Sequence, residues 1–231
     1  MKVVASWSGG KDSAYAVQLA KQQGHEIVNL LTMMSGEEKS KFHMISSELL
    51  NAQASAIEIP LIKKQTTNEM YEQNFKDSLI ELKTKGVEGL VTGDICTVAN
   101  HEEDWLKRIC QETGLKPIRP LWMMDDTKQI YHNYVETGFK ATVVRINVSK
   151  LGIEWLGREL DRQFYGDIIK QDNIDPCGEG GEYHTIVTDG PYFKKKIIIL
   201  ETEKHYLENN FGYLEIKNFI LKNKKDEGLN V

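Results

Sequence analysis

Residues 8–13, Ser-Gly-Gly-Lys-Asp-Ser, decide the fold that this sequence predicts. They follow a short apolar run over residues 2–7 and precede residues 14–24, where apolar side chains recur at helical spacing until a glycine ends the pattern. A strand, a glycine turn and a helix in this order are typical of the first unit of a parallel sheet with crossover helices. We therefore expect an α/β fold that begins with this unit.

The same alternation continues along the chain. Strand-like runs over residues 27–33 and 89–93 alternate with helical spacing over residues 42–56 and 70–82. Further helices are expected over residues 105–110 and 127–135, followed by a β-branched strand over residues 141–148. Strands that alternate with helices predict a Rossmann-like, doubly wound parallel sheet over residues 1–150.

The pattern changes after residue 150. A glycine-rich segment over residues 175–191 precedes an apolar strand at residues 197–200 and apolar residues at even positions between 214 and 220. Alternation of this kind is typical of antiparallel strands. The sequence thus predicts a second, smaller mixed α+β domain over residues 151–231.

Composition excludes several classes of function. The chain has 231 residues and a formal net charge of -5, so it offers no broad basic field for nucleic acid or an anionic membrane. Cys96, Cys110 and Cys177 form neither a CxxC pair nor an even disulfide set, which disfavours sulfur transfer to RNA and indicates cytosolic thiols. Because the amino terminus has too short an apolar run for a signal peptide, we expect a cytoplasmic protein without membrane or nucleic-acid partners.

The residue types of the 8–13 loop favour an anion. Paired glycines let backbone N–H groups approach phosphate oxygens at a helix start, the hydroxyls of Ser8 and Ser13 can donate, and Lys11 can neutralise charge. The loop is no Walker A motif, because Asp12 rather than serine or threonine follows Lys11. Asp12 would repel phosphates unless it caps the helix or meets Mg²⁺. The alternative is a surface turn in which Asp12 or Ser13 caps the helix without a ligand.

The loop resembles the pyrophosphate-binding loop of the N-type ATP pyrophosphatases, the PP-loop enzymes, and the whole chain resembles the diphthine–ammonia ligase family. The resemblance extends over nearly the full length, through GHE at 24–26, FH at 42–43, GDI at 93–95, PLW at 120–122, GFKA at 138–141, WLGR at 155–158, DPCGEGGEYHT at 175–185 and DGP at 189–191. The 175–185 segment is the most specific, and its CGE and EYHT sequences are closer to a bacterial-type branch of the family. Residues 96–105 depart from the family pattern.

The resemblance implies an adenine-nucleotide hydrolase-like domain of the HUP type and an enzyme of diphthamide biosynthesis that uses ATP and Mg²⁺. ATP would adenylate a carboxylate, pyrophosphate would leave, and ammonia would attack the acyl-adenylate. The family substrate is diphthine on elongation factor 2. The alternatives are amidation of a small carboxylate such as a corrinoid precursor, or an ATP sensor without turnover. We expect ammonium as the nitrogen source, because the sequence is too short to include a separate glutaminase domain. We also expect a homodimer.

The resemblance and the residue types together predict the site. ATP binding is assigned to Ser8, Gly9, Gly10, Lys11, Asp12, Ser13, His43 and Gly93, with Asp12 as the Mg²⁺ ligand. Catalysis is assigned to Lys11, Asp12, Glu179, Glu182 and His184, and substrate binding to Arg158, Gly178, Glu179, Gly180, Gly181 and Glu182. The glutamates would hold ammonium, a cationic substrate group or a metal, and His184 would be a base that keeps ammonia unprotonated.

Each of these assignments has a structural alternative. The 175–185 segment is also compatible with a solvated glycine-rich turn in which His184 simply begins a strand. His43 follows an aromatic residue and would then be a packed or surface histidine, and Arg158 would pair with Asp161 one turn later. Cys177 beside a proline is more typical of packing than of a nucleophile.

Overall fold

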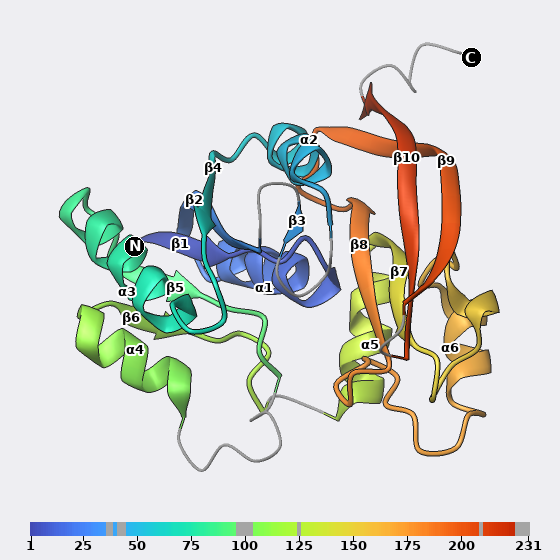
Figure 1. Ribbon diagram of the computed structural model, residues 1–231. Coiled ribbons are helices and arrows are strands. Elements are labelled where there is room, and N and C mark those ends of the chain that lie inside the picture. The colour runs from blue at the N-terminus through green and yellow to red at the C-terminus, as the bar shows by residue number, and fades with distance from the viewer. Residues whose placement is uncertain (36–38, 41–44, 96–103, 124–125, 208–209, 225–231) are drawn as a thin grey trace. The chain divides into compact units, whose positions relative to one another are not determined.

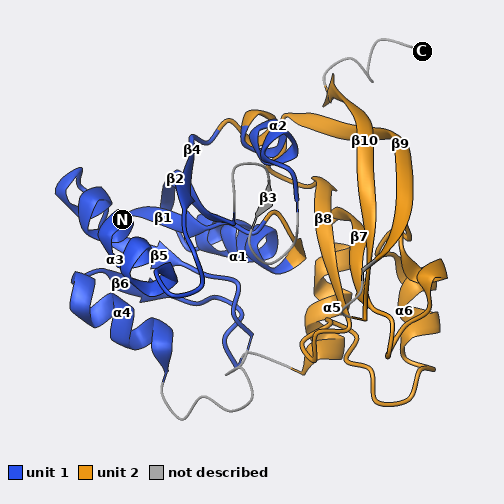
Figure 2. Ribbon diagram, viewed as in Figure 1, with its two compact units in different colours: residues 1–8, 12–54, 59–124 blue, residues 9–11, 55–58, 125–231 orange. Residues whose placement is uncertain are grey.

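The computed structural model describes residues 1–35, 39–40, 45–95, 104–123, 126–207 and 210–224 (Figure 1). The chain divides into two compact units, coloured separately in Figure 2. Unit 1 comprises residues 1–8, 12–54 and 59–124, and unit 2 comprises residues 9–11, 55–58 and 125–231. Three residues of the amino-terminal glycine loop therefore pack with the carboxyl-terminal unit.

Unit 1 is built on a largely parallel sheet. Strands β1 (Lys2–Ser6), β2 (Glu26–Ser35), β4 (Leu61–Gln65), β5 (Gly89–Val91) and β6 (Lys116–Ile118) pair in parallel, and the short β3 (Lys39–Ser40) pairs antiparallel with β2. The sheet runs β3-β2-β1-β5-β6, with β4 also paired to β2. The helices are α1 (Lys11–Gln22), α2 (Ser47–Ile57), α3 (Tyr71–Thr84) and α4 (Trp105–Thr113).

The strand order places the 8–13 loop where ligands bind in such sheets. From β1 the chain adds β2 and β4 on one side and later β5 and β6 on the other, so the order reverses at β1. Ligands of doubly wound sheets bind beyond the carboxyl ends of the strands at this switch point. Residues 8–13 follow the carboxyl end of β1 after Trp7 alone. The predicted Rossmann-like fold is confirmed.

The core of unit 1 explains why these segments form a parallel sheet. Val3, Val4 and Ala5 of β1 are essentially unexposed, as expected for a strand covered on both faces. Val4 and Leu90 belong to a cluster that α3 and α4 close with their apolar faces. The aromatic members Tyr71, Phe75 and Trp105 pack with ring centroids 5.7 to 6.1 Å apart.

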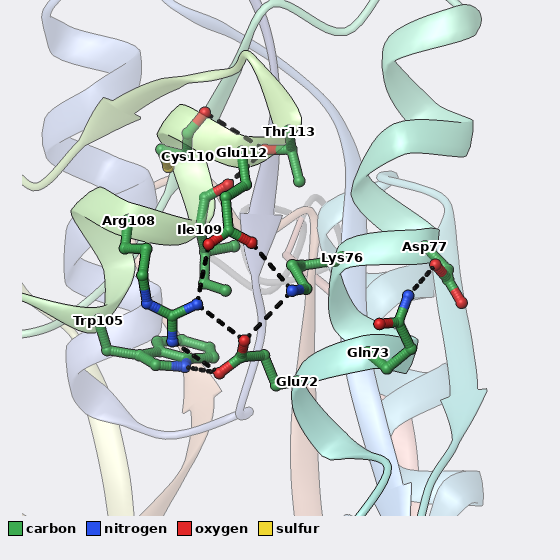
Figure 3. A network of polar contacts seen from close by, with 10 residues as sticks. All are labelled: Glu72, Gln73, Lys76, Asp77, Trp105, Arg108, Ile109, Cys110, Glu112 and Thr113. Atoms are coloured by element: carbon green, nitrogen blue, oxygen red, sulfur yellow. Dashed lines mark hydrogen bonds and ion pairs between the residues drawn. The ribbon is translucent and has the colours of Figure 1, made fainter.

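A polar network fastens α3 to α4 outside this cluster (Figure 3). Glu72 of α3 accepts two hydrogen bonds from Arg108 of α4, each at 2.8 Å, and one from the Trp105 indole N–H at 2.8 Å. Lys76 joins Glu72 to Glu112 at 3.2 and 2.9 Å. These hydrogen bonds hold the pKa of Glu72 at about 2, because Arg108, Trp105 and Lys76 all favour its ionised form.

Unit 2 is built on an antiparallel sheet. Strands β7 (Lys140–Asn147), β8 (Tyr183–Asp189), β9 (Lys195–Leu207) and β10 (Phe211–Asn223) lie in the order β8-β7-β10-β9. The unit also contains α5 (Thr127–Glu136), a 3-10 turn over Ile153–Trp155 and α6 (Arg162–Ile168). The antiparallel carboxyl-terminal architecture agrees with the sequence pattern.

The division between the units differs from the expected boundary near residue 150. The β-branched strand β7, which the sequence placed in the doubly wound half, pairs antiparallel with both β8 and β10. It therefore belongs to the second sheet, and the compact units divide at residues 124 and 125. The reason is that β7 finds its partners roughly 40 to 70 residues later in the chain, which a local pattern does not report.

Three helices, α4, α5 and α6, begin at an aspartate N-cap. Asp104 accepts a hydrogen bond from the Lys107 N–H at the start of α4, Asp126 does so from Gln129 in α5, and Asp161 from Phe164 in α6. Aspartate is among the preferred N-cap residues because its carboxylate satisfies amides that have no helical partner. None of the helices in the described ranges combines the length and the apolarity needed to cross a membrane.

Candidate active site

The start of α1 is held against the strand next to β1. The Ser8 and Ser13 hydroxyl oxygens lie 3.1 Å apart, and Ser13 is buried. Gly93 follows β5, and a Cβ atom at this position would lie only 2.5 Å from the Asp12 carbonyl carbon. Gly93 is thus required by the close approach of two backbones, which sets the position of the loop. Its contact with the nucleotide stays a prediction.

Asp94, which the sequence assignment left out, lies beside the same loop. Its side chain is exposed in part, yet desolvation raises its pKa, and the charges of Asp104 and Asp12 add to this rise. Thr92, which donates to Asp94 at 2.9 Å, and Arg119 act in the opposite direction. Asp94 directly follows Gly93, whose backbone packs against that of half-buried Asp12, so the two aspartates lie in neighbouring segments at the carboxyl end of the parallel strands.

The middle of the glycine loop packs on β8 in unit 2. The Lys11 N–H donates to the Thr185 hydroxyl at 3.0 Å, and the Val187 N–H donates to the Gly9 carbonyl at 2.9 Å. Lys11 is only 6% exposed, and its ammonium lies 5.6 Å from the centroid of the Tyr183 ring. A buried ammonium is costly unless it meets compensating groups, and the aromatic face supplies part of that compensation.

The second glycine segment, residues 178–181, leads into β8. Gly178 has φ +79°, and a Cβ atom there would lie 2.9 Å from the Tyr183 carbonyl oxygen, so the turn requires glycine. Gly180 acts through its carbonyl oxygen, which accepts a hydrogen bond from Lys150 Nζ at 2.8 Å. Gly181 has φ +76° and completes the turn. These glycines shape the loop, and their contact with a substrate stays a prediction.

Glu182 is the most enclosed acid of this segment. The residue is 1% exposed, and its Oε1 accepts from Lys150 Nζ at 3.1 Å and from the Asp175 N–H at 3.4 Å. Its Oε2 is also buried, and no hydrogen-bond partner for it lies within the described ranges. A buried carboxylate oxygen without a donor costs free energy, which makes Glu182 a strong candidate to receive a cation or N–H donor.

Glu179 lies in a different environment from Glu182, although the sequence assigned them similar roles. Its side chain is exposed, and its N–H donates to Asp175 Oδ1 at 3.4 Å. Asp175 also accepts from the Cys177 N–H at 2.7 Å and from the Thr127 hydroxyl at 2.6 Å. Asp175 and Lys150 organise this loop, and the sequence assignment missed both because their partners are not marked by any local spacing.

Arg158 has partners that suggest a structural role, whereas the role of His184 as a base stays a prediction. His184 is half-buried in β8, directly opposite Arg145 of β7, and strand alternation places its side chain on the face opposite Thr185. The Arg158 guanidinium lies 4.5 Å from the centroid of the Trp155 ring and 2.7 Å from Asp167 Oδ2. The ion pair considered for Arg158 thus forms, but with Asp167. His43 lies outside the described residues, and so does Cys96.

The cysteines that the structure describes are packing residues. Cys110 and Cys177 are both buried, and the Cys177 thiol donates to the Thr127 carbonyl at 3.1 Å. Burial raises the pKa of the Cys110 thiol to about 11, which keeps it protonated. A cytoplasmic location stays a prediction from the sequence.

Comparisons with known proteins identify the family. Residues 1–117 match the family model described as the diphthamide synthase N-terminal domain, and residues 126–221 match the diphthamide synthase C-terminal domain. A diphthine–ammonia ligase from Schizosaccharomyces pombe is 27% identical over 94% of this chain, which spans only 39% of that relative. The Homo sapiens diphthine–ammonia ligase is also 27% identical, over 88% of this chain and 84% of its own length.

One solved structure also aligns, a predicted subunit of tRNA methyltransferase from Methanocaldococcus jannaschii, with 17% identity, a TM-score of 0.47 and coverage of 83% of this chain and all of its own. The likeness is too low for any inference about function. The two family models, in contrast, together cover most of the sequence. This chain therefore belongs to the diphthamide synthase family.

Proposed function

We propose that this protein is an ATP-dependent ligase that forms a C–N bond between ammonia and a substrate carboxylate, with diphthine as the substrate and diphthamide as the product. The observation that carries the proposal is the 8–13 loop at the switch point of the parallel sheet, with Lys11 buried at the start of α1. The names of the relatives, diphthine–ammonia ligase, support the same reaction.

In the first step a carboxylate oxygen of the substrate attacks the α-phosphorus of ATP. The bond between the α-phosphorus and the bridging oxygen breaks, and pyrophosphate leaves with the electron pair. The leaving group gains negative charge, which the helix start and the Lys11 ammonium would stabilise because both are fixed before the reaction. Burial of Lys11 strengthens this effect, since fewer water molecules screen its charge.

The residues around this loop fit Mg²⁺. Asp94 follows Gly93, whose backbone packs closely on that of Asp12, and Mg²⁺ is commonly held by one or two carboxylates together with substrate phosphates. We assign the ion to these two side chains. When bound, it would neutralise phosphate charge and reduce the repulsion that Asp12 and Asp94 exert on ATP.

In the second step ammonia attacks the acyl carbon of the adenylate. A new C–N bond forms, the bond to the AMP oxygen breaks, and AMP leaves with the electron pair while the nitrogen gives up a proton. Ammonium must first lose its own proton to become a nucleophile. We assign Glu182 to this ion, because its buried Oε2 offers a negative acceptor and its Oε1 is already fixed by Lys150.

The alternatives differ in product rather than in loop geometry. A small carboxylate would pass through the same two steps, and residues 96–105, where the sequence departs from the family pattern, are the reason to include it. An ATP sensor would bind the nucleotide without either step. The 175–185 segment resembles the bacterial-type branch of the family, which is a second reason to test small carboxylates as substrates.

The decisive experiment incubates the full chain with ATP, Mg²⁺, ¹⁵N-ammonium and a carboxylate, either diphthine-bearing elongation factor 2 or a panel of small acids. Mass spectrometry should detect AMP, pyrophosphate and a product that carries one ¹⁵N. If the ¹⁵N label appears on a small acid and not on elongation factor 2, that acid replaces diphthine as the proposed substrate. If the protein binds ATP but produces no AMP with any carboxylate, the ligase proposal is overturned and the ATP-sensor alternative is favoured.

A further inference from the structure

Strand β8 contacts both glycine loops of the proposed site. The Val187 N–H binds the Gly9 carbonyl, and the Thr185 hydroxyl accepts from the Lys11 N–H. Tyr183 places its ring 5.6 Å from the Lys11 ammonium. Residues 183, 185 and 187 recur with the strand period of two, so alternate positions of one strand contact residues 9–11, the middle of the proposed phosphate loop at 8–13.

The Thr185 contact controls the first turn of α1. Lys11 is the first residue of α1, and its N–H is one of four amides at a helix start that have no partner within the helix. Both residues are buried, Thr185 at 2% exposure and Lys11 at 6%. Without the Thr185 hydroxyl this amide would lose a buried acceptor, and the direction of the first turn would be less firmly set.

Tyr183 connects the same strand to the loop of residues 175–182, which contains Glu179 and Glu182 and is called the acidic loop below. The Tyr183 hydroxyl donates to the Pro176 carbonyl at 2.5 Å. The Tyr183 carbonyl oxygen packs closely on Gly178, where an added Cβ atom would lie only 2.9 Å from it. Glu182, which we assign to ammonium, directly precedes it in the chain. A shift of the acidic loop would therefore move Tyr183, and with it the strand that fixes Lys11.

We infer that Thr185 is a positioning residue that presets the phosphate loop and couples ATP affinity to the state of the acidic loop through β8. The inference rests on the proposed function for the identity of the two ligands, but the contacts that carry it are those of β8 with residues 9–11 and with residues 176–178. Coupling of this kind is reciprocal, so a tighter acidic loop strengthens nucleotide binding and bound nucleotide steadies the acidic loop.

Calorimetric titration of the full chain with α,β-methylene ATP and Mg²⁺ tests the inference, because this analogue cannot release pyrophosphate. Thr185→Val removes the acceptor and nearly keeps the shape, and we expect its Kd to rise about tenfold. Thr185→Ser restores the hydroxyl and should bind within about twofold of the parent. Thr188→Val is the matched control on the same strand, since Thr188 donates to Lys140 O instead, and it should leave the Kd unchanged.

Coupling is tested by Tyr183→Phe, which keeps the ring near Lys11 but removes the bond to Pro176. Its Kd for the analogue should rise about threefold, and in the Thr185→Val background this increment should disappear. Parent affinity in Thr185→Val, with an unchanged melting temperature, would overturn the positioning role. An unaltered Kd in Tyr183→Phe, or full additivity in the double variant, would overturn the coupling.

A turnover assay separates this inference from the ligase proposal. In an active ligase, Thr185→Val should raise the KM for ATP about tenfold while kcat falls less, and Thr185→Ser should restore both. If the parent protein binds the analogue but never produces AMP, the ligase proposal fails and the binding result still decides the role of Thr185.

Discussion

The two glycine loops of this protein contain the same kinds of residue but hold their charges differently. In the 8–13 loop the charged side chain that becomes buried is Lys11, at a helix start beside the Tyr183 ring. In the second loop Glu182 is buried against Lys150, whereas Glu179, three residues earlier, is exposed. The comparison shows that loop composition does not determine which charged side chains are buried. Burial and partners set Lys11 and Glu182 apart from the solvent-exposed Glu179.

The strongest test of the first loop is Lys11→Ala. If this buried cation stabilises the leaving pyrophosphate as proposed, its loss should lower pyrophosphate release about a thousandfold, by analogy with the removal of one transition-state donor. A pyrophosphate assay and circular dichroism would show whether activity is lost while the fold remains. Lys21→Ala, in the last turn of the same helix, is the matched control and should retain parent activity. Release unchanged in Lys11→Ala would remove the phosphate role from this loop.

Gly93→Ala tests whether backbone packing sets the first loop. The added Cβ would lie 2.5 Å from the Asp12 carbonyl carbon, so the free energy of unfolding should fall by about 3 kcal/mol and affinity for ATP should decrease. Urea denaturation and nucleotide titration measure both effects. In Gly166→Ala the new Cβ meets no atom within 4 Å in α6, and the helix should gain about 0.5–1 kcal/mol. Equal stability of the two variants would contradict the close approach.

The second loop is tested by a pair of glutamate variants. Glu182→Gln should lower formation of the amidated product about a hundredfold, because it neutralises the only acid of this loop that is buried. ATP binding should change little. Glu179→Gln should stay within about twofold of the parent, since its side chain is exposed. Similar losses in both variants, measured by mass spectrometry of product, would return the two glutamates to the equal roles that the sequence suggested.

The smallest effect is expected far from both loops, in the network of Figure 3. Glu72→Gln should lower the free energy of unfolding by about 0.5 kcal/mol at pH 7, because partial exposure screens its ion pairs. The pKa of Glu72 is lowered from 4.5 to about 2, so this stability is present above pH 4.5 and is lost as the pH falls towards 2. Denaturation curves of parent and variant should converge at the acid end, with catalysis unaffected at pH 7. A difference that grows on acidification would contradict the assignment.

Local signals in the sequence predicted much of the fold. The apolar run of β1, the glycine turn and the helix after it are consecutive, so their pattern alone indicates a doubly wound sheet. The boundary between the units could not be predicted in this way. Strand β7 has the β-branched pattern of a parallel strand, and only its register with β8 and β10 places it in the antiparallel sheet.

The candidate site divides along the same line. The 8–13 loop and the 175–185 segment are continuous stretches, and both were found. Lys150 and Thr185 act through partners 32 and 174 residues away, and no spacing rule connects such pairs. Asp94 follows Gly93 in a segment that had been noticed, but its neighbourhood with Asp12 depends on the pairing of β1 with β5.

The bond between Lys11 and Thr185 has a consequence for how the protein is made. The residues that we propose to bind phosphate are among the first to be synthesised, yet the acceptor of the Lys11 N–H on β8 follows 174 residues later. Chains fold from the amino terminus during synthesis at about 5–20 residues per second, so roughly ten to thirty seconds pass before this contact can form. A nascent chain therefore carries an unfinished nucleotide loop until β8 has been translated, and premature termination before β8 would leave that loop without its acceptor.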